Sequence, residues 1–179
     1  MIDMFVNLEL SVLEFFNSIH NPVLDRIFIF ITHLGDKGIF WIITGLVLCF
    51  IPKYRKSGIT MLLALLLMLI IGNITIKPLV ARVRPYEYMD SVKILIEKPS
   101  DFSFPSGHTF SSFAAACSVF LYHKKLGLVF FVLAFLIAFS RLYICVHFPS
   151  DVICGAFFGI GIAYFSRYAL SKNLKFQKL

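Results

Sequence analysis

The sequence predicts an all-α integral membrane protein, a single helical bundle of five to six spans formed by residues 1–179. Three observations predict it: 59% of the residues are hydrophobic, only 15% are charged, and the apolar residues form runs separated by short polar turns. A soluble domain would carry roughly a quarter charged residues. The 21 phenylalanines fit helix surfaces that face lipid, where apolar bulk carries no penalty.

Five apolar runs predict the spanning helices. They cover residues 40–51, 59–76, 110–122, 126–139 and 152–168. A helix needs about 20 residues to cross about 30 Å of hydrocarbon. Several runs reach that length only if their polar ends, such as Ser140-Arg141, lie inside the protein. Polar groups are tolerated at that depth when they face a cavity.

Residues 1–35 predict either an interfacial helix or a sixth span. A polar stripe recurs at helical spacing, made of Asn7, Ser11, Glu14 and Ser18. Apolar residues lie opposite, a pattern typical of an amphipathic helix at the membrane surface. Glu9 argues further against burial in lipid, and Asn21-Pro22 then starts a second short helix that ends at Gly35. The chain start has neither the basic region nor the cleavage site of a signal peptide, so these helices are expected to direct insertion.

A net charge of +7 would fit a nucleic-acid-binding protein, but the basic residues are concentrated in short turns. Such turns are typical of the cytoplasmic side of a membrane protein. This predicted cytoplasmic set is Lys53, Arg55, Lys56, Lys124, Lys125, Lys172, Lys175 and Lys178. The loop 86–104 and the polar clusters described next then face the periplasm or the cell exterior. We expect no nucleic-acid partner.

The four cysteines stand singly in apolar stretches, without the spacing of a metal or redox motif. They are predicted to be buried thiols. A disulfide between Cys145 and Cys154 stays open as an alternative.

The first polar cluster holds two cations, Lys77 and Arg84, seven residues apart and therefore close to two helical turns. The spacing predicts that both point the same way from one helix end, which Pro85 terminates. Two adjacent cations repel each other unless an anion lies between them, so the pair predicts an anion site. Snorkelling to the interface is the alternative. Arg82 falls on a different face and is expected to meet solvent or lipid headgroups.

The second cluster is Pro105-Ser106-Gly107-His108, directly before the apolar run at 110–122. Ser106 is a natural N-cap, and Gly107 lets the backbone approach a ligand closely. Free N–H groups at a helix start bind anions, so His108 would project beside a bound phosphate. A serine-capped helix without any ligand is the alternative.

The third cluster combines Ser140-Arg141 with His147 and Asp151. A helix is expected to begin near Pro149, with Asp151 in its first turn. A carboxylate there can accept a hydrogen bond from one imidazole nitrogen of His147, which leaves the other nitrogen free to attack. The three clusters together predict a phosphatase site: cations bind the phosphate, one histidine attacks it, and the other protonates the leaving group.

The ordered motifs Lys-x6-Arg-Pro, Pro-Ser-Gly-His and Ser-Arg-x5-His-x3-Asp resemble the type 2 phosphatidic acid phosphatase (PAP2) superfamily. They span residues 77–151, and every motif position is filled. The resemblance implies a six-helix core and a metal-free mechanism through a covalent phosphohistidine. It implies that His147 is the nucleophile, Asp151 orients it, and His108 is the general acid. It also implies a phosphate-binding set: Lys77, Arg84, Ser106, Gly107 and Arg141.

The sequence has no second carboxylate cluster to hold Mg²⁺ or Zn²⁺, so we expect neither a metal nor another cofactor. We expect a lipid phosphatase of the bacterial cytoplasmic membrane, resembling the small members that act on undecaprenyl diphosphate. Phosphatidylglycerophosphate, phosphatidic acid and lipid A phosphates are the alternative substrates. A transporter or channel selecting anions is the alternative of a different class, but a pore needs no oriented nucleophile such as His147 with Asp151.

Overall fold

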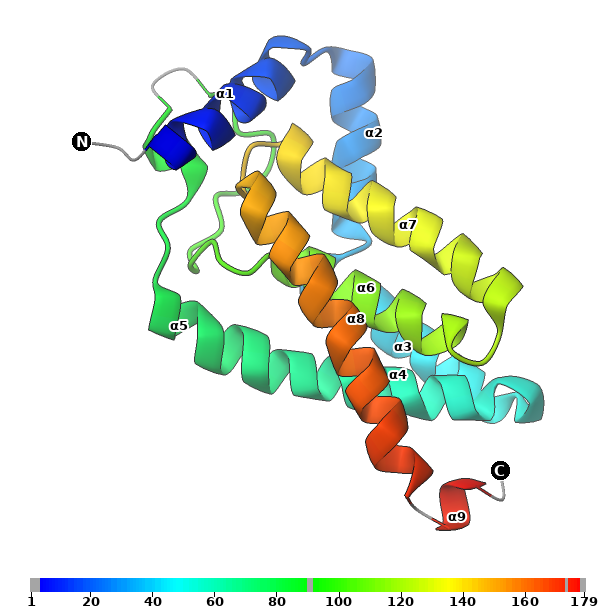
Figure 1. The fold of residues 1–179 in the computed structure, drawn as a ribbon. Helices are drawn as coiled ribbons and strands as arrows, with labels where there is room; N and C mark the ends of the chain where they lie inside the picture. The colour runs from blue at the N-terminus through cyan, green and yellow to red at the C-terminus, as the bar shows by residue number, and fades with distance from the viewer. Residues whose placement is uncertain (1–3, 90–91, 173, 178–179) are drawn as a thin grey trace.

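The computed structural model describes residues 4–89, 92–172 and 174–177, and all regular elements in these ranges are helices (Figure 1). The predicted all-α fold is confirmed. The helices pack around α6 (Gly107–Phe120), which contacts α4 (Arg55–Met68), α7 (Lys124–Tyr143) and α8 (Pro149–Ser171). Residues 109–119 of α6 are all buried, because neighbours cover this helix on every side.

Small residues bring α6 and α8 into backbone contact. A Cβ atom added to Gly155 would lie 3.0 Å from the Ser106 carbonyl oxygen, and one added to Gly159 would lie 2.6 Å from that of Phe110. The two glycines form a small-xxx-small pattern, which allows close helix packing where lipid gives no hydrophobic driving force between helices. We call this contact the α6–α8 seam.

A long continuous helical segment runs from α4 through a π-helical stretch, Leu69–Ile76, into α5 (Lys77–Val80). It ends because Ala81 has a left-handed backbone, φ 48°. Arg84 therefore follows in extended conformation, before the 3₁₀ turn Pro85–Glu87. The prediction that Lys77 and Arg84 share one helix end is wrong, although both side chains reach the same cavity.

Four segments are long and apolar enough by length and composition to cross a membrane. They are Pro22–Phe50, Pro52–Glu87, Lys124–Tyr143 and Pro149–Ser171. The first joins α2 (Pro22–His33), the 3₁₀ turn Asp36–Gly38 and α3 (Ile39–Phe50). The five to six predicted spans are not confirmed. The run at 110–122 is not among the four, since α6 has only 14 residues.

Helix α1 (Met4–Ser18) crosses one end of the bundle against α7 and α8 (Figure 1). Its buried face consists of Glu9, Leu10 and Leu13, and the two leucines pack with Cys145 and Phe148. The predicted polar stripe is exposed, but Glu9 is 4% exposed. Glu9 is expected to avoid lipid, and the structure buries its carboxylate in protein instead, against Arg82.

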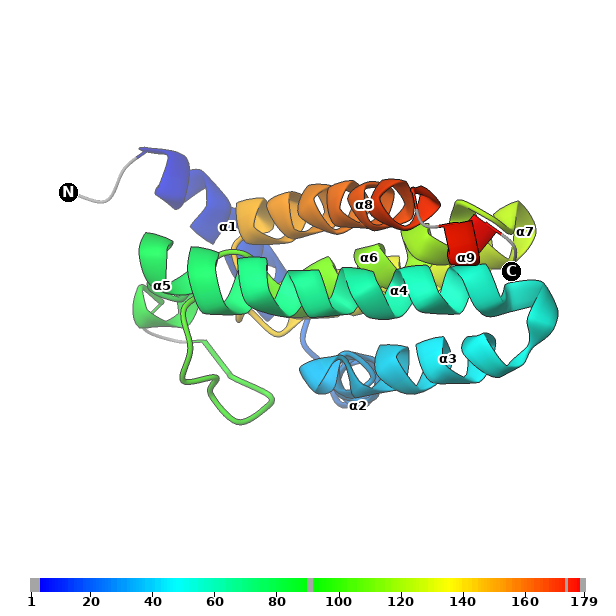
Figure 2. The same cartoon turned by 90° about the horizontal axis from the view of Figure 1, so that it is seen from below.

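The turns before α4 and α7, which carry basic residues, lie at one end of the bundle, and α5 lies at the other (Figures 1 and 2). Tyr54, in the turn before α4, packs on His123, in the turn before α7, with ring centroids 4.8 Å apart. Lys56 donates to the Gln177 carbonyl at 3.1 Å, so the C-terminal segment joins the same end. Lys178 and residues 1–3 lie outside the described residues.

The long loop after the 3₁₀ turn at Pro85–Glu87 folds back onto the bundle. Its apolar residues 92 and 94–96 pack against Tyr86, Tyr143, Ile144 and Val146. So apolar a stretch could form a lid that dips into the membrane interface or pack locally, and these contacts favour local packing. All four cysteines are free, so no bridge joins Cys145 to Cys154.

Candidate active site

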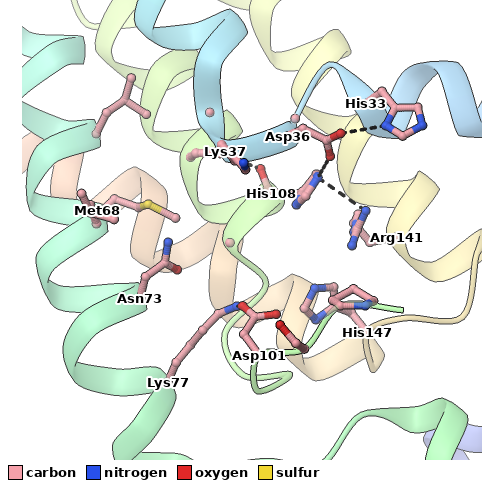
Figure 3. Close-up of a pocket in the computed structure, with 18 of the residues that line it drawn as sticks. His33, Asp36, Lys37, Met68, Asn73, Lys77, Asp101, His108, Arg141 and His147 are labelled. Atoms are coloured by element: carbon pink, nitrogen blue, oxygen red, sulfur yellow. Dashed lines mark hydrogen bonds and ion pairs between the residues drawn. The ribbon is translucent and has the colours of Figure 1, made fainter. Parts of the chain in front are cut away.

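A cavity of about 920 Å³ lies at the end of the bundle where the three polar clusters meet (Figure 3). The predicted site residues that line it are Lys77, Arg84, Gly107, His108, Arg141 and His147. They come from α5, the extended segment after it, α6, α7 and the α7–α8 connection. Helix ends thus bring together residues that are 70 positions apart in the chain.

Lys77 and Arg84 meet on one carboxylate, that of Asp101. The Lys77 ammonium donates to one oxygen, and Arg84 Nη2 donates to the other at 2.6 Å. Arg84 Nε also donates to the Asp101 carbonyl oxygen at 2.8 Å, and its Nη1 to that of Val146 at 2.7 Å. Both cations are buried, whereas the Asp101 side chain is 53% exposed. The pair does enclose an anion, as predicted, but here the anion belongs to the protein.

The Asp101 carboxyl shows how strongly this region favours negative charge. Partial burial raises its pKa, but the hydrogen bond from Lys77 and the charges of Lys77 and Arg84 outweigh burial and hold the pKa at about 2. A site that stabilises one carboxylate to this degree stabilises a phosphate dianion by the same interactions.

His147 lies against Asp151, the predicted orienting carboxylate. The two are 1% and 0% exposed, and His147 Nδ1 is 3.5 Å from Asp151 Oδ2. Ser103 bridges this gap, because its hydroxyl donates to Asp151 Oδ2 and lies 3.4 Å from Nδ1. Asp151 Oδ2 also accepts from the Phe148 amide at 2.9 Å, so it caps its own helix as well. Such contacts are often long before substrate binds.

The nucleophilic nitrogen of His147 follows from these neighbours. Since Nδ1 faces an acceptor, we assign the proton to Nδ1, and the lone pair of Nε2 then faces the cavity, 3.4 Å from Arg84 Nη1. Burial and the charges of Arg84 and Arg141 hold the pKa of His147 well below its usual value. The imidazole is therefore neutral at pH 7, as attack on phosphorus requires.

Arg141 and His108 form the opposite wall of the cavity. Arg141 Nη1 donates to Thr32 Oγ1 at 2.6 Å and lies 3.5 Å from His108 Nε2. Among the described residues, the buried Nε of Arg141 has no hydrogen-bond partner, which leaves this donor for a ligand. His108 Nε2 lies 3.0 Å from Asp36 Oδ1, and His33 contacts the other oxygen of that carboxylate (Figure 3).

Ser106 and Gly107 occupy different positions relative to the cavity. Ser106 is fully buried, caps α6 through Thr109, and donates its backbone N–H to the Asp151 carbonyl at 3.1 Å. Gly107 lines the cavity, and a Cβ atom on it would come within 3.3 Å of Asn73 Oδ1. The predicted N-cap is confirmed. Gly107 belongs to the cavity wall, whereas Ser106 is not among the described residues that line the cavity.

Arg82 does not face solvent or headgroups, so that prediction is wrong. Its guanidinium donates to Asp151 Oδ1 at 2.5 Å, to Ser150 Oγ at 2.7 Å and to Glu9 Oε2 at 2.6 Å. It also stacks over the Phe148 ring, 4.0 Å from the centroid. The left-handed turn at Ala81 redirects the chain and brings Arg82 behind the His147–Asp151 pair.

The sequence therefore identified six residues that line the cavity, but it missed two carboxylates that also line it and further polar residues that support the site. The missed residues are Glu9, Thr32, Asp36, Asp101 and Ser103. Each is a polar residue without a motif of its own, and only the unusual placement of acidic residues beside apolar runs could have signalled them. The arrangement provides a neutral imidazole backed by a carboxylate, three cations and a second histidine beside a carboxylate.

A family model described as the PAP2 superfamily matches residues 57–175. The undecaprenyl-diphosphatase of Sulfolobus acidocaldarius is 31% identical over 161 residues, 89% of this chain and 76% of that protein. The crystal structure of Aquifex aeolicus LpxE has a TM-score of 0.77 at 31% identity, covering 89% of this chain and 94% of that one. A transmembrane PAP2-type phosphatidylglycerolphosphate phosphatase from Bacillus subtilis has a TM-score of 0.74 at 26% identity, covering 93% and 86%.

Proposed function

The chain belongs to the PAP2 superfamily, and from this premise we propose that it hydrolyses undecaprenyl diphosphate to the monophosphate and inorganic phosphate. The observation that carries the proposal is the neutral, buried His147 imidazole, whose Nε2 faces a cavity walled by three cations. This arrangement suits attack on a phosphoryl group, whose negative charge the cations can stabilise in the transition state.

In the first step, Nε2 of His147 forms a bond to the terminal phosphorus as the bond from phosphorus to the bridging oxygen breaks. His108 donates its proton to that leaving oxygen. Burial and the charge of Arg141 lower the pKa of His108 to about 4, although Asp36, 3.0 Å from Nε2, raises it. The imidazolium form that must donate is therefore proposed to form when the negative charge of the substrate phosphate is bound beside the ring. The Nδ1 proton of His147 stays between the ring and Asp151, which offsets the positive charge that forms on the ring.

In the second step, water attacks the phosphohistidine and the N–P bond breaks. His108, now neutral, accepts the water proton and returns to the form it had before turnover. Phosphate leaves, and His147 is restored as a neutral imidazole. All protons are transferred between His108, substrate and water, so the proposed cycle needs neither a metal nor a redox cofactor.

The choice of a diphosphate has two supports. The Sulfolobus acidocaldarius relative is named an undecaprenyl-diphosphatase, and it is similar over 89% of this chain. In addition, Lys37 and Lys98 line the same cavity beyond the three cations, next to Asp36 and Glu97, so further cations are available to a second phosphoryl group. A diphosphate also expels a phosphate monoester, a better leaving group than an alkoxide.

We further propose that the site opens to the periplasm or cell exterior. The basic turns before α4 and α7 lie at the end of the bundle opposite α5 (Figure 2), and α5 begins with Lys77, which lines the cavity. This is the arrangement that the positive-inside rule requires if these turns are cytoplasmic. Cysteines introduced into these turns should resist an impermeant thiol reagent on intact cells, and cysteines in the loop 92–98 should react. Labelling of the turn at 53–56 instead would reverse the orientation.

The function is tested by phosphate release from the purified protein in mixed micelles. Undecaprenyl diphosphate, phosphatidylglycerophosphate and phosphatidic acid are compared at equal surface density, each with and without EDTA and with vanadate. We expect the diphosphate to be fastest, EDTA to have no effect, and vanadate to inhibit as a mimic of the five-coordinate phosphorus. If the diphosphate is slowest, the substrate assignment fails; if EDTA abolishes activity and Mg²⁺ restores it, the metal-free mechanism fails.

A further inference from the structure

A buried network joins the N-terminal helix to the catalytic carboxylate. Arg82 lies between two acidic side chains, with Nη1 2.5 Å from Asp151 Oδ1 and Nη2 2.6 Å from Glu9 Oε2. The Asp151 and Glu9 side chains are 0% and 5% exposed, and that of Arg82 is 21% exposed. Charges this deeply buried interact strongly because little water screens them.

Glu9 also fixes the helix that carries Asp151. Its second oxygen, Oε1, accepts from the backbone N–H of Ser150 at 2.8 Å, in the first turn of α8. Arg82 meanwhile donates to the Ser150 hydroxyl and stacks on Phe148. One glutamate from α1, outside the three motifs, therefore holds both the guanidinium and the start of α8.

The charges of the network decide what Asp151 can do for His147. Two carboxylates and one guanidinium have a net charge of −1, so Glu9 neutralises Arg82 and leaves the Asp151 charge for the imidazole. Without Glu9, the cation 2.5 Å from Asp151 would neutralise it instead. Asp151 would then offset the positive charge on phosphorylated His147 less well.

We propose that Glu9 and Arg82 are positioning residues for the Asp151–His147 pair, with Glu9 preserving the negative charge that the phosphohistidine step uses. This inference depends on the proposed function, since it assigns a role in that reaction. It makes α1 a part of the catalytic apparatus rather than a membrane-surface helix. Neither residue touches the cavity, so both act through Asp151.

The central test is Glu9→Gln, which keeps an oxygen acceptor for Ser150 but removes the charge. We expect kcat to fall about 10- to 100-fold, the range found when outer-shell hydrogen-bond partners are removed elsewhere, with KM within about twofold of wild type. Glu14→Gln is the matched control, because Glu14 is on the same helix and exposed. It should retain wild-type kcat.

The double variant Glu9→Gln with Arg82→Gln separates the charge effect from simple loss of packing. Removing both charges restores a net charge of −1 on Asp151, so the double variant should recover at least about tenfold in kcat over Glu9→Gln alone. A purely structural role predicts the opposite, since the double variant loses more contacts. Thermal unfolding of each variant is measured in detergent to detect a loss of folding. Arg82→Lys retains the positive charge and should therefore have a higher kcat than Arg82→Gln.

The outcomes are distinct. If the wild type hydrolyses the substrate in a His147-dependent way and Glu9→Gln retains full kcat, the inference about Glu9 is wrong while the proposed function stands. A double variant slower than Glu9→Gln also overturns it, because charge balance is then not the cause. A wild type without His147-dependent hydrolysis overturns the proposed function and this inference with it.

Discussion

The two sides of His147 differ in how their charges are held. Behind the ring, Asp151 is 0% exposed and receives hydrogen bonds from Ser103, Arg82 and the Phe148 amide. In front of it, Lys77 and Arg84 share the Asp101 carboxylate, which is 53% exposed and belongs to a loop. The rear side is closed and fully hydrogen-bonded, whereas the front side holds an anion that solvent can reach.

This difference indicates which part of the site is preorganised and which part is exchangeable. The rear contacts come from helices and buried residues, so they persist whether or not substrate is bound. The front contacts must be exchanged, because a phosphate that binds Lys77 and Arg84 has to replace the Asp101 oxygens. Substrate binding then costs little in new desolvation, since the two cations are already paired with an anion.

The largest effect should come from removing the residue between the two sides. His147→Asn should reduce lipid phosphate hydrolysis to background, because among the described cavity histidines only His147 is backed by a fully buried carboxylate, that of Asp151. Phosphate release measured with a malachite green assay checks this. Asp151→Asn should lose roughly 10³- to 10⁴-fold, and near-normal turnover by the His147 variant would contradict the mechanism.

His108→Asn tests whether His108, on the front side of the site, protonates the leaving group. We expect a loss of roughly 10²- to 10⁴-fold for a lipid alkoxide, which needs a proton as it departs. An activated ester such as p-nitrophenyl phosphate needs none and should lose much less. Equal losses for both substrates would show that His108 binds phosphate rather than protonating the leaving group.

Asp101→Asn tests the exchangeable front side directly, because it removes the negative charge of Asp101 while keeping a side chain of the same shape. Without a competing carboxylate, inorganic phosphate and vanadate should inhibit about tenfold more strongly, a gain of about 1.4 kcal/mol. Inhibition constants measured at constant substrate density check this. Weaker inhibition would mean that Asp101 chiefly holds Lys77 and Arg84 in place.

The smallest effect is a pH dependence of stability from His147. Burial and the surrounding cations lower its pKa in the folded state, so the unfolded chain binds the proton more readily. Its contribution is fully present above the unfolded pKa of about 6.5 and is lost as pH falls below that value, by at most about 1.4 kcal/mol per pH unit. Thermal unfolding between pH 7.5 and 5 should therefore depend less on pH in His147→Asn than in wild type.

The sequence predicts the cavity well because its residues carry recognisable chemistry. Lys77, Arg84, His108, Arg141 and His147 all line one cavity, although Lys77 and Arg84 are not on one helix as their spacing suggested. A helical repeat gives the direction of a side chain only while the helix continues. The left-handed residue Ala81 ends it without a glycine or proline to signal the break.

The supporting residues could not be predicted, since their roles depend on long-range packing. Glu9 and Asp151 are 142 positions apart and are linked through Arg82 and the Ser150 backbone N–H. An acidic residue in an amphipathic helix is usually exposed, and nothing local to α1 indicates a buried cation opposite it. The predicted five to six spans are not confirmed for a related reason: α6 has only 14 residues and protein surrounds it, and hydropathy alone does not distinguish burial in protein from burial in lipid.

The α6–α8 seam has a consequence for how the site responds to the bilayer. Because Gly155 and Gly159 bring the two backbones together and the Ser106 N–H is bonded to the Asp151 carbonyl, the helix that presents His108 and the helix start behind His147 form one rigid unit. A change in hydrocarbon thickness would tilt this unit as a whole. We therefore expect the spacing of the two histidines to be insensitive to lipid chain length, so that membrane thickness alters access of the lipid tail and leaves the chemical step unchanged.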